Sequence, residues 1–106
     1  MRIRNATNAD LSAVESLLSA SDLPLDGVRE NFSSFVVAED RGAITGAIGL
    51  EKSGSAALLR SVVVSPDSRG SGIGSRLGEQ ILERAEEEGI DDLYLLTTTA
   101  ETRTRV

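Results

Sequence analysis

The chain has 106 residues, of which 40% are hydrophobic and 26% charged; this composition is typical of one small folded domain and too apolar for a disordered segment. It contains no cysteine and no histidine, which excludes disulfides, thiolate zinc sites and histidine-dependent hydrolase triads. The net charge of −6 and the scattering of the 11 basic residues argue against a nucleic-acid partner.

The charged residues have one further peculiarity, which is that Lys52 is the only lysine. An acidic surface poor in lysine has two interpretations, adaptation to high salt or a codon bias of the genome, and both stay open. The N-terminal residues contain no long apolar run, so we expect a cytoplasmic protein with no membrane partner.

The first third of the chain predicts a strand followed by a helix. Residues 1–6 alternate apolar and polar side chains, as an edge strand does. Thr7 and Asp10 have the spacing of a capping box and predict the start of a helix. Residues 21–32 are compatible with a short second helix or with a loop. The apolar stripe of the first helix consists of Leu11, Val14, Leu17 and Leu18.

The centre of the chain predicts three antiparallel strands, and its end predicts a helix and one more strand. A turn at residues 40–42 and a second at 52–55 separate the three strands of a meander. Gly89 follows the helix and is expected to take the left-handed conformation that ends it. The predicted elements are Phe35–Glu39, Ala43–Glu51, Ala56–Val64, the helix Gly72–Glu88 and the strand Asp91–Thr98. The apolar stripe of this helix consists of Ile73, Leu77, Ile81, Leu82 and Ala85.

These elements predict one α+β domain over residues 1–106, with α/β/α layers. Its sheet is expected to be mixed, mostly antiparallel, and to contain about five strands. The order of the elements along the chain is β-α-(α)-β-β-β-α-β. The strand before the late helix and the strand after it should pair in parallel through a right-handed crossover. The end of Ala56–Val64 is apolar enough to be buried on both faces.

A glycine-rich loop between that strand and the helix carries the chemical signal. Gly70, Gly72 and Gly74 allow the backbone to approach a ligand closely, and the helix that follows directs its unpaired N–H groups toward an anion. Arg69 adds a cation, and the hydroxyls of Ser71 and Ser75 add donors. No lysine follows the glycines as a P-loop requires, and the third glycine of a dinucleotide-binding fingerprint is missing. The loop therefore predicts a phosphate site of another kind.

The pattern Arg-x-x-Gly-x-Gly, formed by Arg69, Gly72 and Gly74 after a valine-rich strand, resembles the GNAT superfamily of acetyl-CoA-dependent N-acetyltransferases. The resemblance extends over nearly the whole chain, because the order of elements follows that family through its fifth strand. It implies an acyl-CoA N-acyltransferase-like fold, acetyl-CoA as acetyl donor, no metal, and transfer to a primary amine of a small molecule or protein. Residues 58–62 and 94–99 are similar to the arsenic-resistance-associated branch of the family.

The resemblance also implies the residues that bind acetyl-CoA. The backbone of the last three strand residues would pair with the pantetheine arm, and the loop amides would hold the pyrophosphate. The implied residues are Val62, Val63 and Val64 on the strand and Arg69, Gly70, Ser71, Gly72, Ile73, Gly74 and Ser75 in the loop and first helical turn.

Two charged residues are candidates for the acceptor side. Glu51 ends an apolar strand and is our first choice for the base that takes the amine proton, while the alternative is a solvated turn carboxylate beside Lys52. Arg60 lies inside an apolar strand, on the same face as Val62 and Val64 if side chains alternate regularly. It either binds an acidic group of the substrate or pairs with an acidic side chain, Glu39 or Glu51.

The polar residues after the last predicted strand differ from the family pattern, which continues with a helix and two strands. The sequence thus predicts a domain that lacks this C-terminal part and exposes the edge of its last strand, a surface through which two copies could form a homodimer. Two functional classes remain: an acetyltransferase, and a CoA-binding or interaction module with little or no turnover. Tyr94 lies within the strand, so the family's acid role for a tyrosine is not carried over to it.

Overall fold

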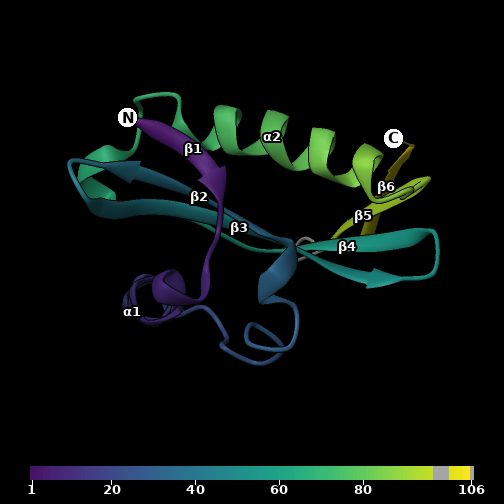
Figure 1. The fold of residues 1–106 in the computed structure, drawn as a ribbon, viewed down its shortest axis with the longest axis horizontal. Coiled ribbons are helices and arrows are strands. Elements are labelled where there is room, and N and C mark those ends of the chain that lie inside the picture. The colour runs from purple at the N-terminus through teal and green to yellow at the C-terminus, as the bar shows by residue number, and fades with distance from the viewer. Residues whose placement is uncertain (97–100, 106) are drawn as a thin grey trace.

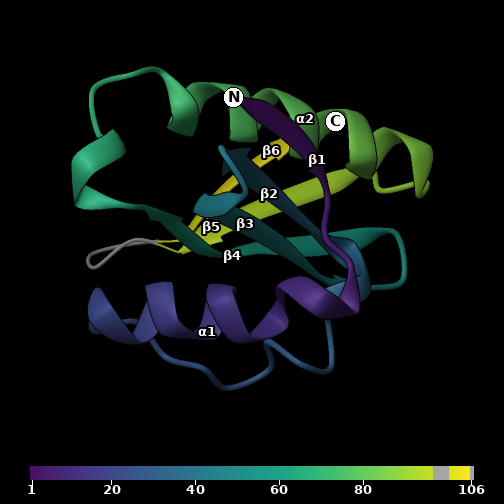
Figure 2. The ribbon, with the colours of Figure 1, turned by 60° about the vertical axis from the view of Figure 1, so that its left-hand side comes forward.

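The computed structural model of the chain describes residues 1–96 and 101–105. Its sheet has six strands in the order β1-β2-β3-β4-β5-β6 and lies between two helices. Figures 1 and 2 show α1 (Leu11–Ala20) on one face of the sheet and α2 (Ile73–Glu87) on the other. The predicted α/β/α layering is confirmed.

The first four strands are antiparallel, and the last three of them form the predicted meander. They are β1 (Arg2–Asn5), β2 (Phe35–Asp40), β3 (Ala43–Ser53) and β4 (Ala56–Val64), each paired with the next. The two hairpin turns contain Gly42 and Gly54, both with positive φ, as tight connections between antiparallel strands require.

The crossover through α2 is also confirmed, because β5 (Asp92–Leu96) pairs with β4 in parallel. Gly89 has φ 74° and ends α2 as predicted. The predicted strand continued to Thr98, and the similarity to the arsenic-resistance-associated branch used Thr99; residues 97–99 lie outside the described part of the chain.

The absence of a strand after β5 was predicted and is wrong. β6 (Glu101–Arg105) pairs with β5 in antiparallel register, so the edge of β5 that was expected to be exposed is covered. The sequence of β6 alternates threonine with charged residues. It therefore has the β-branched residues that favour strands but no apolar face, and apolar periodicity was the signal on which the prediction depended.

Two buried clusters fill the space between the layers. The cluster below α2 is built on Leu77 and Ile81 of the helix, and the cluster above α1 on Val14 and Leu18, all four fully buried. These are positions of the apolar stripes read from the sequence, so the helices pack where amphipathicity directs them. Among the described residues, no helix is long and apolar enough to cross a membrane.

The segment after α1 forms a loop rather than a second α-helix. Turns occupy residues 21–22 and 26–31, and a short 3-10 helix, Phe32–Ser34, leads into β2. Asp22 and Gly27 both have positive φ, which interrupts any helical path. Val28 is fully buried and fixes the loop on the α1 side of the sheet.

Candidate active site

β4 contains a β-bulge near its middle. Gly49 of β3 lies opposite Arg60, while Ala47 lies opposite Val63, so β4 uses one residue more than β3 over this stretch. Ser61, inside the bulge, has φ 58°, a left-handed conformation that residues other than glycine seldom adopt. An extra residue moves every later side chain of the strand to the opposite face of the sheet.

The bulge corrects the predicted orientation of the β4 side chains. Val63 packs in the cluster beside α1 and Val64 against the cluster beside α2. Arg60 contacts the loop on the α1 side, so Arg60 and Val64 lie on opposite faces rather than on one. Val62 is 45% exposed, which contradicts the expectation that this end of the strand is buried on both faces.

The bulge coincides with the point where β4 separates from β5. Parallel pairing joins Ala56–Leu59 to residues 92–95, and no later β4 residue pairs with a described residue of β5. The Ser65 amide donates to the Thr45 carbonyl at 2.8 Å, which makes this a hydrogen-bonded pair of the β3–β4 ladder. Since such pairs alternate, the amide and carbonyl of Val64 point away from β3, toward the opening between β4 and β5.

The glycine loop lies directly beyond this opening. Gly70 and Gly72 have φ 84° and 85°, and Gly72 is the N-cap of α2 with no side chain capping the helix. The first N–H groups of α2 therefore have no acceptor within the helix and form a positively polarised surface. A Cβ added at Gly70 or Gly72 would meet no atom within 4 Å, so the space in front of these glycines is open to a ligand.

The remaining loop residues have distinct positions. Arg69 Nε donates to the Val64 carbonyl at 3.2 Å, which places the guanidinium where the strand meets the loop. The Ser71 hydroxyl donates to the Ser68 carbonyl, so its proton is used inside the loop rather than offered to a ligand. Ile73 is 4% exposed and holds the first turn of α2 on the core, while Ser75 is exposed in the same turn.

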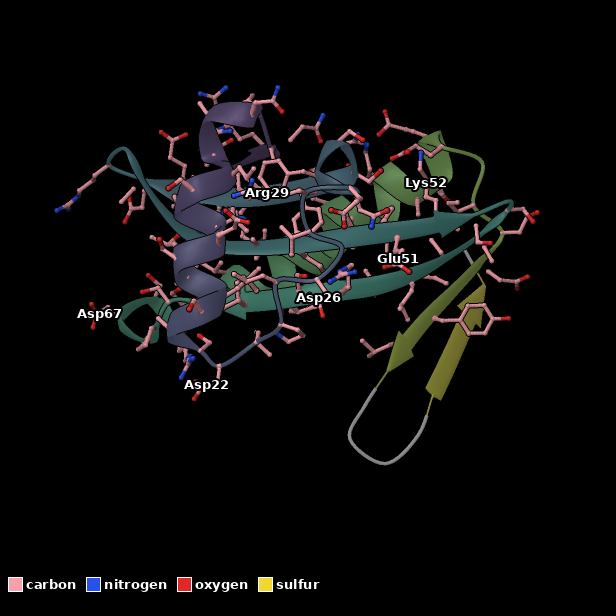
Figure 3. The ribbon with its side chains drawn as sticks, turned by 90° about the horizontal axis from the view of Figure 1, so that it is seen from below. Asp22, Asp26, Arg29, Glu51, Lys52 and Asp67 are labelled. Carbon is pink, nitrogen blue, oxygen red and sulfur yellow. The ribbon has the colours of Figure 1, made fainter. Side chains whose placement is uncertain are left out.

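The two candidates of the acceptor side are in direct contact. Arg60 Nη1 donates to Glu51 Oε1 at 2.6 Å, whereas Glu39, the other partner considered, pairs with Arg4 at 2.7 Å. Arg60 Nη2 also donates to the main-chain carbonyl of Asp26. Figure 3 shows Asp26 of the loop and Glu51 of β3 close together on the α1 face of the sheet.

A cavity of about 340 Å³ extends from Glu51 along the same face. Glu51, Leu58 and Tyr94 lie opposite one another on β3, β4 and β5, and all three line the cavity. Cross-strand neighbours share a face of the sheet, which explains how residues far apart in sequence form one wall. Strand register decides this arrangement, and the single sequence carries no signal for it. In the described part of the chain, no group of three or more acidic side chains is arranged to hold a metal ion.

Comparisons with known proteins agree with this architecture. The model of the acetyltransferase (GNAT) family matches residues 2–105. No curated protein sequence matches the chain. The solved structure of Rv2747 from Mycobacterium tuberculosis, in complex with CoA, has a TM-score of 0.80 and 25% identity over 92% of this chain and 65% of that one.

Two further structures extend the comparison. N-acetylglutamate synthase from Neisseria gonorrhoeae, complexed with coenzyme A and N-acetyl-glutamate, has a TM-score of 0.79 and 24% identity over 92% of this chain and 25% of that one. Ard1 from Thermoplasma volcanium has a TM-score of 0.75 and 26% identity over 89% of this chain and 69% of that one. The chain therefore spans 65% and 25% of the length of the first two proteins, with the same fold. It belongs to the GNAT acetyltransferase family.

Proposed function

We propose that the protein is an N-acetyltransferase that moves the acetyl group of acetyl-CoA to a primary amine of a small molecule or protein. One observation carries this proposal: the uncapped start of α2 and the outward-facing backbone of Val64 border the same opening between β4 and β5. The first is suited to a pyrophosphate and the second to an extended amide-containing arm. Two of the similar proteins were solved in complex with CoA, which supports acetyl-CoA here.

Acetyl-CoA binding is assigned to the loop and the strand end. The amides of residues 70–75 would hold the pyrophosphate, with Arg69 as the cation at the rim. Val62, Val63 and Val64 would carry the pantetheine arm, which adds to the exposed edge of β4 as another strand does. The amide of Val64 is the group whose direction best suits this pairing, since the Val64 carbonyl already accepts a hydrogen bond from Arg69.

The reaction is direct attack of the amine nitrogen on the thioester carbonyl. We assign the proton acceptor to Glu51, because its carboxylate is 46% exposed, lines the cavity on the α1 face and lies beside the strand opening. Arg60 is assigned to an acidic group of the acceptor, since it is a cation at that opening. Positioning of the amine against the thioester supplies most of the rate enhancement under this mechanism.

The test follows release of the CoA thiol from acetyl-CoA in the presence of a panel of primary amines. Turnover above the amine-free rate, reduced in Glu51→Gln but not in Glu15→Gln, supports the enzyme. Glu15 is a suitable control because it pairs with Arg29 at the surface, away from the opening. Saturable acetyl-CoA binding without thiol release for any amine would instead identify a CoA-binding module, and no binding would contradict both.

A further inference from the structure

Arg60 connects three separate segments of the chain. Its Nη1 donates to Glu51 at 2.6 Å, its Nε donates to the Ser61 hydroxyl at 3.3 Å, and its Nη2 donates to the Asp26 carbonyl. The Arg60 side chain is 16% exposed, whereas that of Glu51 is 46% exposed. The guanidinium is therefore held between β3, the bulge of β4 and the loop of residues 21–31.

Of these contacts, the ion pair with Glu51 is the one that a ligand can replace. Glu51 reaches Arg60 through one oxygen and one guanidinium nitrogen. A guanidinium binds a carboxylate best through two parallel N–H···O bonds, and half-exposed single-contact ion pairs add little stability. Each terminal nitrogen of a guanidinium carries two N–H groups, so an incoming carboxylate can bond to Nη1 in place of Glu51 and to the second N–H of Nη2 while the Asp26 contact is kept.

The position of Arg60 relates such a carboxylate to the reaction. Among the described residues, the last β4–β5 pair joins Leu59 to Leu95, so Arg60 is the first residue beyond this paired part of β4. Under the proposed function the acetyl group lies at this opening. In an α-amino acid the amine and the carboxylate are bonded to the same carbon, so a carboxylate bound to Arg60 holds the amine next to Glu51 and the opening.

We propose that Arg60 exchanges Glu51 for the carboxylate of an α-amino acid, and that α-amino acids are the acceptor class of this protein. This inference rests on the proposed acetyl transfer. Glu51, once released, takes one proton from the acceptor ammonium, and the neutral nitrogen then forms a C–N bond with the thioester carbonyl carbon. The C–S bond breaks with its electron pair on sulfur, which takes the second N–H proton. The products are the N-acetyl amino acid and the CoA thiol, and Glu51 passes its proton to water.

Carboxylate exchange would select acceptors as well as activate them. An amine without a carboxylate leaves Glu51 Oε1 paired with Arg60, and no contact to Arg60 then holds the amine nitrogen beside the Glu51 carboxylate. A carboxylate-bearing amine frees that oxygen and brings the ammonium group to it in the same step. Arg60 thus acts as the specificity-determining residue, and Glu51 as the base that depends on it.

Gly27 offers a readout of the exchange that does not require turnover. A Cβ placed on Gly27 would lie 2.3 Å from Arg60 Nη1, so the Gly27 backbone lies directly against the guanidinium. A shift of the guanidinium toward an incoming carboxylate changes the surroundings of the Gly27 amide. The resonance of this amide in a ¹⁵N-labelled protein therefore reports occupancy of Arg60.

The experiment titrates the CoA-loaded protein with L-α-amino acids and with their α-amides while the Gly27 resonance is followed. We expect at least one amino acid to shift the resonance saturably, with a Kd at least about tenfold below that of its amide. Arg60→Gln should bring this ratio close to one. Arg60→Lys, which keeps the charge but not the fork of donors, should reduce it in part. Arg29→Gln, a change in the same loop that removes only a surface pair with Glu15, should keep the wild-type ratio.

Steady-state kinetics give a second, independent readout. Arg60→Gln should raise the KM of the amino acid about tenfold, and Glu51→Gln should lower kcat with little change in KM. The exchange is overturned if no amino acid shifts Gly27, if amino acids and amides bind equally, or if the preference survives in Arg60→Gln. Carboxylate-selective binding without any release of CoA thiol would support the exchange and contradict the proposed acetyl transfer, so the two failures are distinguishable.

Discussion

Replacing Gly72 by alanine tests the geometry of the loop. Gly72 caps α2 with φ 85°, and an added Cβ would meet no atom within 4 Å. The penalty is therefore conformational rather than steric: an L-residue in the left-handed region costs about 1–2 kcal/mol. If the loop keeps its shape, this penalty reduces the free energy of unfolding, and each kcal/mol lowers the Tm of a domain of this size by about 4–8 °C.

If the loop relaxes instead, the penalty is transferred to ligand binding. The amides that follow Gly72 then leave the arrangement suited to a pyrophosphate and must be brought back when acetyl-CoA binds. A cost of 1–2 kcal/mol corresponds to a Kd about 5- to 30-fold weaker. Thermal unfolding together with calorimetric titration of acetyl-CoA on Gly72→Ala measures both parts of the penalty.

Gly78→Ala is the matched control, because this glycine lies farther along α2, outside the loop assigned to acetyl-CoA, and has no positive φ. Its added Cβ would also meet no atom within 4 Å. We expect unchanged or slightly raised stability and a Kd within about threefold of the wild type. Equal damage from both substitutions, or no change in Tm and Kd with Gly72→Ala, would refute the reasoning.

Three further predictions concern stability. The hydrogen bond from Arg4 lowers the pKa of Asp10 from 3.8 to about 2, so this carboxylate stabilises the fold fully above about pH 4 and loses its contribution as the pH falls through 2. This contribution to the free energy of unfolding is about 2 kcal/mol. The loss of stability as the pH falls from about 4 to 2 should therefore be smaller in Asp10→Asn than in the wild type. An identical pH dependence of the two proteins would contradict the assignment. Gly49→Ala should destabilise the protein by about 1–3 kcal/mol in denaturant unfolding, because the new Cβ would lie 2.2 Å from the ring of the fully buried Phe35. Wild-type stability of this variant would show that the ring can move. If the net charge of −6 reflects adaptation to salt, the Tm should rise in molar KCl, and a constant Tm would leave codon bias as the explanation.

The elements that could be predicted from the sequence are those with a local signal. The stripes that contain Val14 and Leu18 on α1 and Leu77 and Ile81 on α2 identified the helices and the faces that they bury. The glycine loop was recognisable because its spacing, its position between strand and helix and its chemistry all point to one kind of ligand.

The elements that could not be predicted depend on contacts between distant residues. The bulge at Ser61 occurs at a residue other than glycine, and the apolar runs on either side of Arg60 and Ser61 read as one continuous strand, so no local pattern indicates it. β6 has two polar faces in sequence and becomes a strand through its pairing with β5. The contact of Arg60 with Asp26 joins residues 34 positions apart, and its existence depends on the path of a loop that the sequence left undecided.

The central claim is that the loop at the start of α2 and the outward edge of β4 form one acetyl-CoA site. The most direct measurement is a titration of the ¹⁵N-labelled protein with CoA, in which every backbone amide is followed. We predict saturable shifts that are largest for residues 69–75 and for Val62 and Val64, with α1 nearly unchanged. Absence of saturable shifts, or shifts centred on α1, would contradict the claim.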